Sequence, residues 1–140
     1  MRPFVPAATA DLAERLRTDI VPEVAGFRAG NVGMTAAMLD MIGQEWDRAA
    51  ARLVEENSAM RALLVRGAAL IGGPQPLDDP NADLHVSALE AANEALRQGL
   101  ITLQSTIEER INDEARALDE AIWDELRRSV ERRRIASANF

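Results

Sequence analysis

The chain has 140 residues, of which 47% are hydrophobic, and it carries a net charge of −7. This is the size of one ordinary domain, with enough apolar content for a core, so the composition argues against global disorder. Cysteine, tyrosine and lysine are absent, which excludes disulfides, zinc–thiolate sites, Schiff bases and a P-loop lysine.

The charge is unevenly distributed along the chain. Residues 1–126 carry 11 arginines and 22 acids, whereas residues 127–140 carry five arginines and one glutamate. An acidic body argues against nucleic-acid binding, which needs a basic surface. No apolar run approaches the ~20 residues of a membrane span, and prolines and acids interrupt any signal-peptide core near the N-terminus. We therefore expect a soluble, cytoplasmic protein that binds neither nucleic acid nor membranes, and the arginine-rich, lysine-free composition fits a GC-rich bacterial genome.

The N-terminal third predicts an arm and a first helix. Residues 1–8 contain two prolines and predict an extended arm. Apolar residues at helical spacing predict a helix over 9–29, which Pro22 should kink or end early because proline lacks an N–H. The sequence "AGNVG" at 29–33 predicts a turn.

A second helix is expected over 33–71, where apolar residues recur every three or four positions. Gly72 and Gly73 should end it, because glycine tolerates the left-handed conformation of a helix C-terminus. The prolines that follow prevent it from resuming, so 72–80 is interpreted as a hinge that finishes with an aspartate cap.

The third helix is expected over 81–134. Leu96, Ile107 and Leu118 are eleven residues apart, a period of ~3.67 residues per turn that favours one straight helix. A break within 110–114 is the alternative. Residues 137–140 form a short tail after a single helical domain, 9–136.

These lengths predict the architecture. Helices of roughly 58 and 80 Å do not fit a compact 140-residue globule with a radius of gyration of ~14 Å. We expect an all-α fold, an elongated antiparallel hairpin of two long helices with a shorter N-terminal helix, related to a coiled coil. Its exposed apolar stripe favours a homodimer that forms a helical bundle.

Each of the two long helices carries one asparagine within its apolar seam. Asn57 lies in the first seam and Asn93 in the second, at the same level if the hairpin turns near residue 76. A buried asparagine pair costs stability but fixes the register, because any slip leaves amides unpaired. We predict that this pair sets the register; the alternative is two solvated amides at the edge of the seam.

Candidates for chemistry are few. The single histidine, His85, has no serine or second histidine near it in sequence, and an exposed residue at a helix start is the favoured interpretation. No catalytic or cofactor-binding residue is assigned, and no cofactor is expected. The acids that could hold magnesium, if they converged, occur in three pairs: Glu55 and Glu56, Glu108 and Glu109, and Glu120 and Asp124.

Two further groups could bind a partner or a ligand. Met34, Met38, Met41 and Trp46 are interpreted as core, with an apolar ligand pocket as the alternative. The C-terminal cations complement a helix dipole, and they could instead dock an acidic partner. They are Arg127, Arg128, Arg132, Arg133 and Arg134.

The sequence thus favours a non-enzymatic α-helical interaction, adaptor or structural protein that acts as a homodimer and has room for a protein partner. The alternatives are a magnesium-dependent phosphohydrolase that uses clustered carboxylates and a carrier of small apolar ligands. An interaction protein would have no bound cofactor. A phosphohydrolase would have acids that converge from at least two helices, and a ligand carrier would have an apolar cavity.

Overall fold

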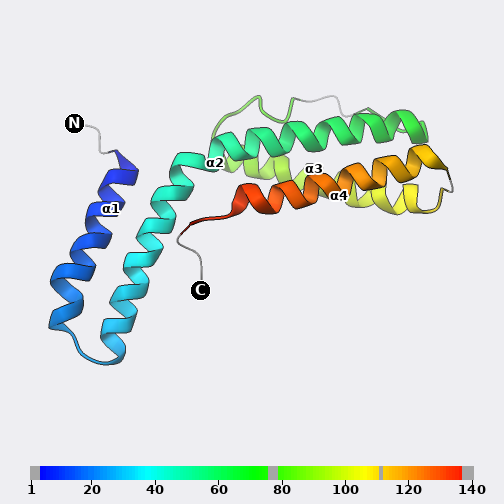
Figure 1. Cartoon of the computed structure of the whole chain (residues 1–140). Coiled ribbons are helices and arrows are strands. Elements are labelled where there is room, and N and C mark those ends of the chain that lie inside the picture. The colour runs from blue at the N-terminus through cyan, green and yellow to red at the C-terminus, as the bar shows by residue number, and fades with distance from the viewer. Residues whose placement is uncertain (1–3, 76–78, 111, 137–140) are drawn as a thin grey trace. The chain divides into compact units, whose positions relative to one another are not determined.

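The computed structural model describes residues 4–75, 79–110 and 112–136. Within these ranges the chain forms helices and turns but no strand, which confirms the expected all-α fold, and it has four α-helices where three were expected (Figure 1). The contacts divide the chain into two compact units. Unit 1 comprises Met1–Ala49 with Arg134–Phe140, and unit 2 comprises Ala50–Arg133.

The first helix, α1, spans Val5–Arg15. The prediction of an extended arm over 1–8 is therefore wrong from residue 5 onward. Pro6 lies in the first turn of the helix, where proline is favoured because the first N–H groups have no partner within the helix.

The first helical segment also ends earlier than the predicted residue 29. After α1 the chain forms a π-helical turn, Leu16–Ile20, and then a 3₁₀ turn, Val21–Glu23. Pro22 lies within that second turn and cannot donate a backbone hydrogen bond, so the α-helical ladder is lost there. Gly26 then adopts φ +60°, a conformation open to glycine at little cost.

The second helix, α2, spans Phe27–Ile71. The turn predicted at 29–33 is wrong, because those residues lie inside α2 and the chain has already reversed at Gly26. The predicted stop is confirmed: Gly72 has φ +70°, and the N–H of Gly73 donates to the carbonyl of Ala68 over 3.0 Å. This is the hydrogen bond of a glycine C-cap.

Unit 1 is a hairpin of α1 and residues 27–49 of α2, in which the helices approach closely through small residues. A methyl group added to Gly43 would collide with the side chain of Thr9. Arg17 and Asp40 form an ion pair across the hairpin. The buried residues of unit 1 are all small: Thr9, Ala13, Ala36, Gly43 and Ala49.

The third helix begins later than the predicted residue 81. Asp79 accepts a hydrogen bond from the N–H of Asn81, and Asp83 accepts one from the N–H of His85. Aspartates that bond two residues onward stabilise turns in competition with a helix. As a result, α3 spans Val86–Glu108.

The predicted continuity of the helix over 81–134 is also wrong, because α3 ends at Glu108 and a fourth helix, α4, spans Asp113–Arg133. Asn112 caps α4: its Oδ1 accepts from the N–H of Ala115 over 2.7 Å. Two acids in the first turn of α4 complement the helix dipole. The break falls within the 110–114 alternative.

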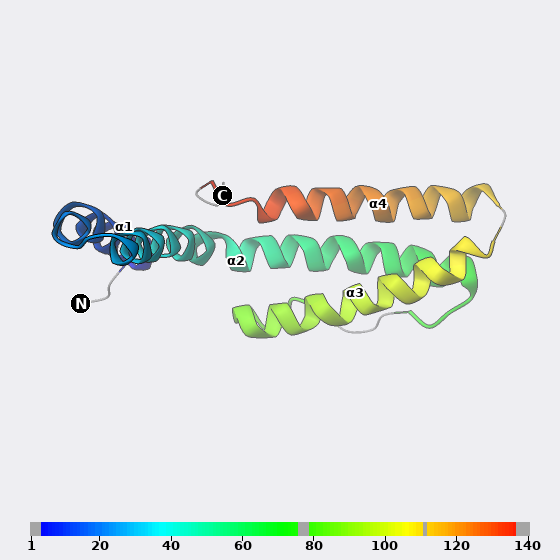
Figure 2. The same cartoon turned by 90° about the horizontal axis from the view of Figure 1, so that it is seen from below.

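Unit 2 is consequently a three-helix bundle, in which α3 and α4 lie along residues 50–71 of α2 (Figures 1 and 2). The predicted pair of two long helices is wrong, because α4 folds back along α2. Leu103 packs so closely on Gly67 that a methyl group added there would displace the leucine side chain. The core consists of Met60, Leu63, Leu96, Leu100, Leu103, Ile107, Ala115, Leu118 and Ile122.

Across the described ranges, no helix combines the length and the apolar character that a membrane crossing requires.

Candidate functional site

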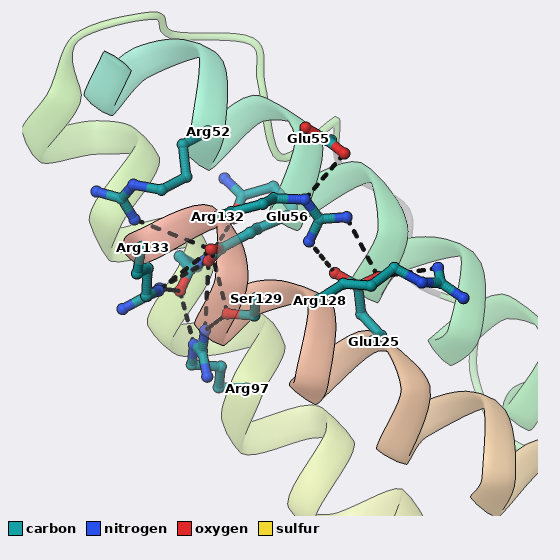
Figure 3. Close-up of polar contacts among 11 residues, drawn as sticks. Arg52, Glu55, Glu56, Arg97, Glu125, Arg128, Ser129, Arg132 and Arg133 are labelled. Atoms are coloured by element: carbon teal, nitrogen blue, oxygen red, sulfur yellow. Dashed lines mark hydrogen bonds and ion pairs between the residues drawn. The ribbon is translucent and has the colours of Figure 1, made fainter. Parts of the chain in front are cut away.

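A buried carboxylate joins the three helices of unit 2. Glu56 lies on α2 with only 1% of its surface exposed. Its Oε1 accepts hydrogen bonds from Ser129 Oγ and from Arg133 Nε, each at a distance of 3.1 Å. Its Oε2 accepts from Arg133 Nη2 over 2.7 Å and from Asn93 Nδ2 over 3.2 Å. The Glu56 network of Figure 3 therefore links α2 to α3 through Asn93 and to α4 through Ser129 and Arg133.

Two more arginines surround the same carboxylate. Nη2 of Arg97 lies 3.3 Å from Oε2 of Glu56 and also donates to Ser129 Oγ over 2.9 Å. Nη1 of Arg52 lies 3.9 Å from Oε1. Three arginines thus surround one buried carboxylate. Each arginine lies four residues from another member of the network on the same helix: Arg52 from Glu56, Arg97 from Asn93 and Arg133 from Ser129.

These neighbours decide the protonation of Glu56. Burial alone would raise the pKa of its carboxyl, but the hydrogen bonds and charge of Arg133, with the bonds from Ser129 and Asn93, outweigh burial. The pKa of Glu56 therefore lies below its ordinary value. The carboxylate is ionised at neutral pH and is held by arginines, an environment that suits a structural ion pair better than a general base.

The two seam asparagines meet beside this carboxylate. Nδ2 of Asn93 donates to Oδ1 of Asn57 over 2.9 Å, and Nδ2 of Asn57 donates to the carbonyl of Leu89 over 3.1 Å. Both side chains are buried, and Arg97 donates to Asn93 Oδ1 over 2.8 Å. The structure thus brings together the two residues that the sequence paired, while their role in setting the register stays a prediction.

A second buried acid, Glu125, lies on α4, one helical turn before Ser129. Glu125, which is 3% exposed, accepts from Arg132 over 2.6 Å and from Arg128 over 3.5 Å. Arg132 also pairs with Glu55 of α2 over 2.9 Å. The hydrogen bond that Arg132 donates to Glu125, together with the one to Glu55 and the charges of both acids, raises the pKa of Arg132 above its ordinary value.

The C-terminal arginines are distributed over several intramolecular contacts. Arg132 and Arg133 belong to the two acid networks, and Arg127 pairs with Asp124 over 2.6 Å at the surface. Arg128 contacts Glu125 while two-thirds of its side chain stays exposed. The carbonyl of Arg134 accepts from Arg48 over 2.7 Å within unit 1. Within the predicted docking group, the side chains of Arg127 and Arg128 are about two-thirds exposed, whereas that of Arg132 is 17% exposed.

The acids considered for magnesium do not converge. Glu55 and Glu56 face arginines, Asp124 pairs with Arg127, and Glu108 and Glu109 are exposed at the end of α3. Glu120 is exposed on α4. Among residues 4–75, 79–110 and 112–136, no group of three or more histidine, cysteine or acidic side chains is placed to hold a metal ion.

His85 caps the start of α3 and is exposed. Its Nδ1 lies 2.6 Å from Oδ1 of Asp83, which also accepts from the backbone N–H of His85. The backbone hydrogen bond and then the ring hydrogen bond lower the pKa of Asp83. Both residues therefore have a clear local role at a helix start, as the favoured interpretation expected.

A groove of about 450 Å³ runs along α3 beside the Glu56 network. Its apolar residues include Leu53, Leu100, Ile122 and Leu126, and its polar rim includes Arg97, Glu90 and Glu94. The side chains proposed as an apolar pocket lie elsewhere, on unit 1. There Met34, Met38 and Trp46 are exposed, and none of them lines the hollow of that unit.

The Glu56 network was not anticipated as such. Sequence reasoning placed Asn57 and Asn93 together but treated Glu56 only as a metal candidate. One signal was available: Arg52 and Glu56 are four residues apart, as are Asn93 and Arg97, and Ser129 and Arg133. Such spacing places two polar side chains on one helix face, here within an apolar seam.

Compared with protein-family models, curated proteins and solved structures, the chain matches none.

Proposed function

We propose that this protein is a non-catalytic α-helical interaction module, an adaptor or a structural component of the cytoplasm, that acts as a homodimer. One observation carries the proposal. Among the described residues of unit 1, those that are buried are no larger than threonine, whereas eight large apolar side chains are exposed. Burying alanine and glycine contributes little free energy compared with burying leucine or methionine.

The exposed side chains are concentrated on this unit. Of the thirteen large hydrophobic residues that are exposed among those described, eight lie between residues 4 and 46. Single apolar side chains on a surface are ordinary, but a contiguous apolar patch is typical of an interaction site. A hairpin with an alanine core gains most of its stability only when such a patch is covered.

The chemistry of unit 2 supports the same proposal. Its most buried acid, Glu56, is bonded to arginine, serine and asparagine side chains that join three helices. Each of these contacts stabilises the bundle. A catalytic carboxylate would instead be expected to face a substrate, with its pKa raised toward the operating pH.

Light scattering on a sizing column, in magnesium and in EDTA, tests the proposal. We expect about 31 kDa in both buffers, twice the 15.3 kDa of one chain. A mass of 15 kDa in both buffers would contradict the homodimer. A mass that depends on magnesium would favour the carboxylate-based alternative.

A further inference from the structure

We propose that the exposed face of the unit 1 hairpin binds the same face of a second copy of this chain, with the two α2 helices antiparallel. This inference rests on the proposed homodimer and names its interface. The hairpin face, as we call it, consists of Leu12, Phe27, Met34, Met38, Ile42 and Trp46.

The spacing of the five α2 residues in this set produces one apolar face. Met34, Met38, Ile42 and Trp46 follow one another at intervals of four, which places them in a continuous stripe along α2. Asp40 and Gln44 lie about half a turn away from Ile42 and Trp46. The hairpin therefore has an apolar and a polar side.

The polar side of the hairpin is in contact with Arg134 and Ala136, which follow α4. The N–H of Ala136 donates to Gln44 over 3.1 Å, and Arg48 donates to the carbonyl of Arg134 over 2.7 Å. A shallow hollow on this side lies between the two helices, and its lining includes Asp40, Gln44 and Asp47 of α2. On the apolar side, Met34, Met38, Ile42 and Trp46 remain at least half exposed among the residues that the structure describes.

The size of the hairpin face suits a dimer. Its six side chains are between 50% and 85% exposed. Since large side chains bury up to roughly 150–250 Å² each, the face offers roughly 700 Å². A stable interface of standard size buries about 800 Å² on each partner. Two hairpins stacked by this face form a four-helix bundle, which covers both stripes at once.

The charge distribution favours a second copy and an antiparallel orientation. Unit 1 has six arginines and seven acids, a net charge of −1, so its copies repel each other little. Unit 2 has ten arginines and sixteen acids, a net charge of −6. In a parallel pair the two copies of Ala49, after which each chain enters the acidic unit 2, would lie side by side. In an antiparallel pair they would lie toward opposite ends of the paired helices.

Paired variants test the surface. We would measure the mass of the full chain, of the double variant Met38→Glu/Ile42→Glu and of the control Ile101→Glu, by light scattering at one concentration. All three sites are at least half exposed, so each substitution is compatible with the fold of the single chain. Circular dichroism checks that helicity is retained.

The expected result is about 31 kDa for the unchanged chain and the control, and half that mass for the double variant. If all three remain dimers, the hairpin face is overturned while the proposed homodimer stands. If the unchanged chain is a monomer, both proposals fail. If the double variant loses its helical signal, cross-linking of the single-cysteine variants Thr35→Cys and Asn31→Cys decides whether the hairpin face is the interface.

Because the chain has no cysteine, single cysteines introduced on the hairpin face can test by disulfide cross-linking whether two copies meet there and whether their α2 helices are antiparallel. The stripe from Phe27 to Trp46 has its midpoint between residues 36 and 37. In an antiparallel pair the two copies of Thr35 are then about 5 Å apart along the helix, and those of Asn31 about 16 Å apart. Disulfides need Cα atoms within ~7 Å.

Under mild oxidation we therefore expect Thr35→Cys to yield a covalent dimer and Asn31→Cys to remain single chains on a non-reducing gel. Equal cross-linking of both variants would overturn the antiparallel orientation. Cross-linking of neither variant would overturn the hairpin face as the dimer interface.

Discussion

Glu56 is the buried side chain whose hydrogen bonds join the three helices of unit 2. Replacing it by glutamine keeps the shape but removes the anion that Arg52, Arg97 and Arg133 surround. Breaking a buried ion pair costs about 3–5 kcal/mol, and partial exposure of the arginines reduces this, so we expect Glu56→Gln to lower the free energy of unfolding by about 2–3 kcal/mol. Urea denaturation at pH 7 measures it.

The matched control is Glu108→Gln, an exposed glutamate on α3 for which a change within about 0.5 kcal/mol is expected. Equal stability of the two variants would mean that the Glu56 network contributes nothing to unit 2.

The same residue predicts a pH dependence. The folded-state pKa of Glu56 lies below its ordinary value. Its stabilising effect is therefore complete above the unfolded pKa of about 4.3 and is lost as the pH falls through the lower, folded value. Arginines do not titrate in this range.

Unfolding free energies of the unchanged chain and of Glu56→Gln, measured from pH 7 to pH 3, should therefore converge only below about pH 4.5. A difference that stays constant over the whole range would show that the carboxylate is not what the arginines stabilise.

The asparagine pair allows a double-mutant cycle. Asn57→Ala removes one of the two acceptors of Asn93 Nδ2, and Asn93→Ala removes the donor to Asn57 Oδ1. Buried groups in direct contact couple, so we expect the two losses of unfolding free energy to differ from additivity by about 1 kcal/mol. Strictly additive losses would indicate that the amides act independently, and the register hypothesis would lose its basis.

At the element scale, the boundary between α3 and α4 depends on Asn112. Its side chain accepts the hydrogen bond that starts α4. We expect Asn112→Ala to cost about 1 kcal/mol, while Asn112→Asp should be nearly neutral because aspartate also caps and complements the dipole. Thermal unfolding of both variants, followed by circular dichroism, separates the loss of the cap from a change of charge.

The sequence predicted the helical content, but it gave a break within 110–114 only as the alternative to one continuous helix. The reason is physical. Ile107 and Leu118 both belong to the core, and their spacing of eleven is that of one straight helix. Two separate helices that pack against the same side of α2 can show this spacing even though the chain reverses between them. The boundary was therefore indicated by the capping residue Asn112 and not by the spacing of the apolar residues.

The same contrast holds at the end of α2 and in the hairpin of unit 1. Gly72 and Gly73 were predicted correctly, because a C-cap is a local feature of two or three residues. The turn at Gly26 was misplaced, because several glycines competed for it and only one adopts a positive φ in that stretch.

At the scale of the whole molecule, the contacts of Glu56 show what one sequence cannot reveal. Its partners Arg97, Ser129 and Arg133 lie 41, 73 and 77 residues away. Which arginine reaches which acid depends on where the chain folds back. A predicted helix that ran straight through residue 112 placed them far apart. The seam asparagines were predictable because their pairing needed only the reversal between α2 and α3.

Self-association of this chain underlies both proposals. Sedimentation equilibrium of the unaltered protein over a range of loading concentrations measures it. We expect a mass that rises with concentration toward about 31 kDa, twice the single-chain mass of 15.3 kDa. A mass that stays at 15.3 kDa at every concentration would contradict it, and the exposed apolar face of unit 1 would then require a different partner.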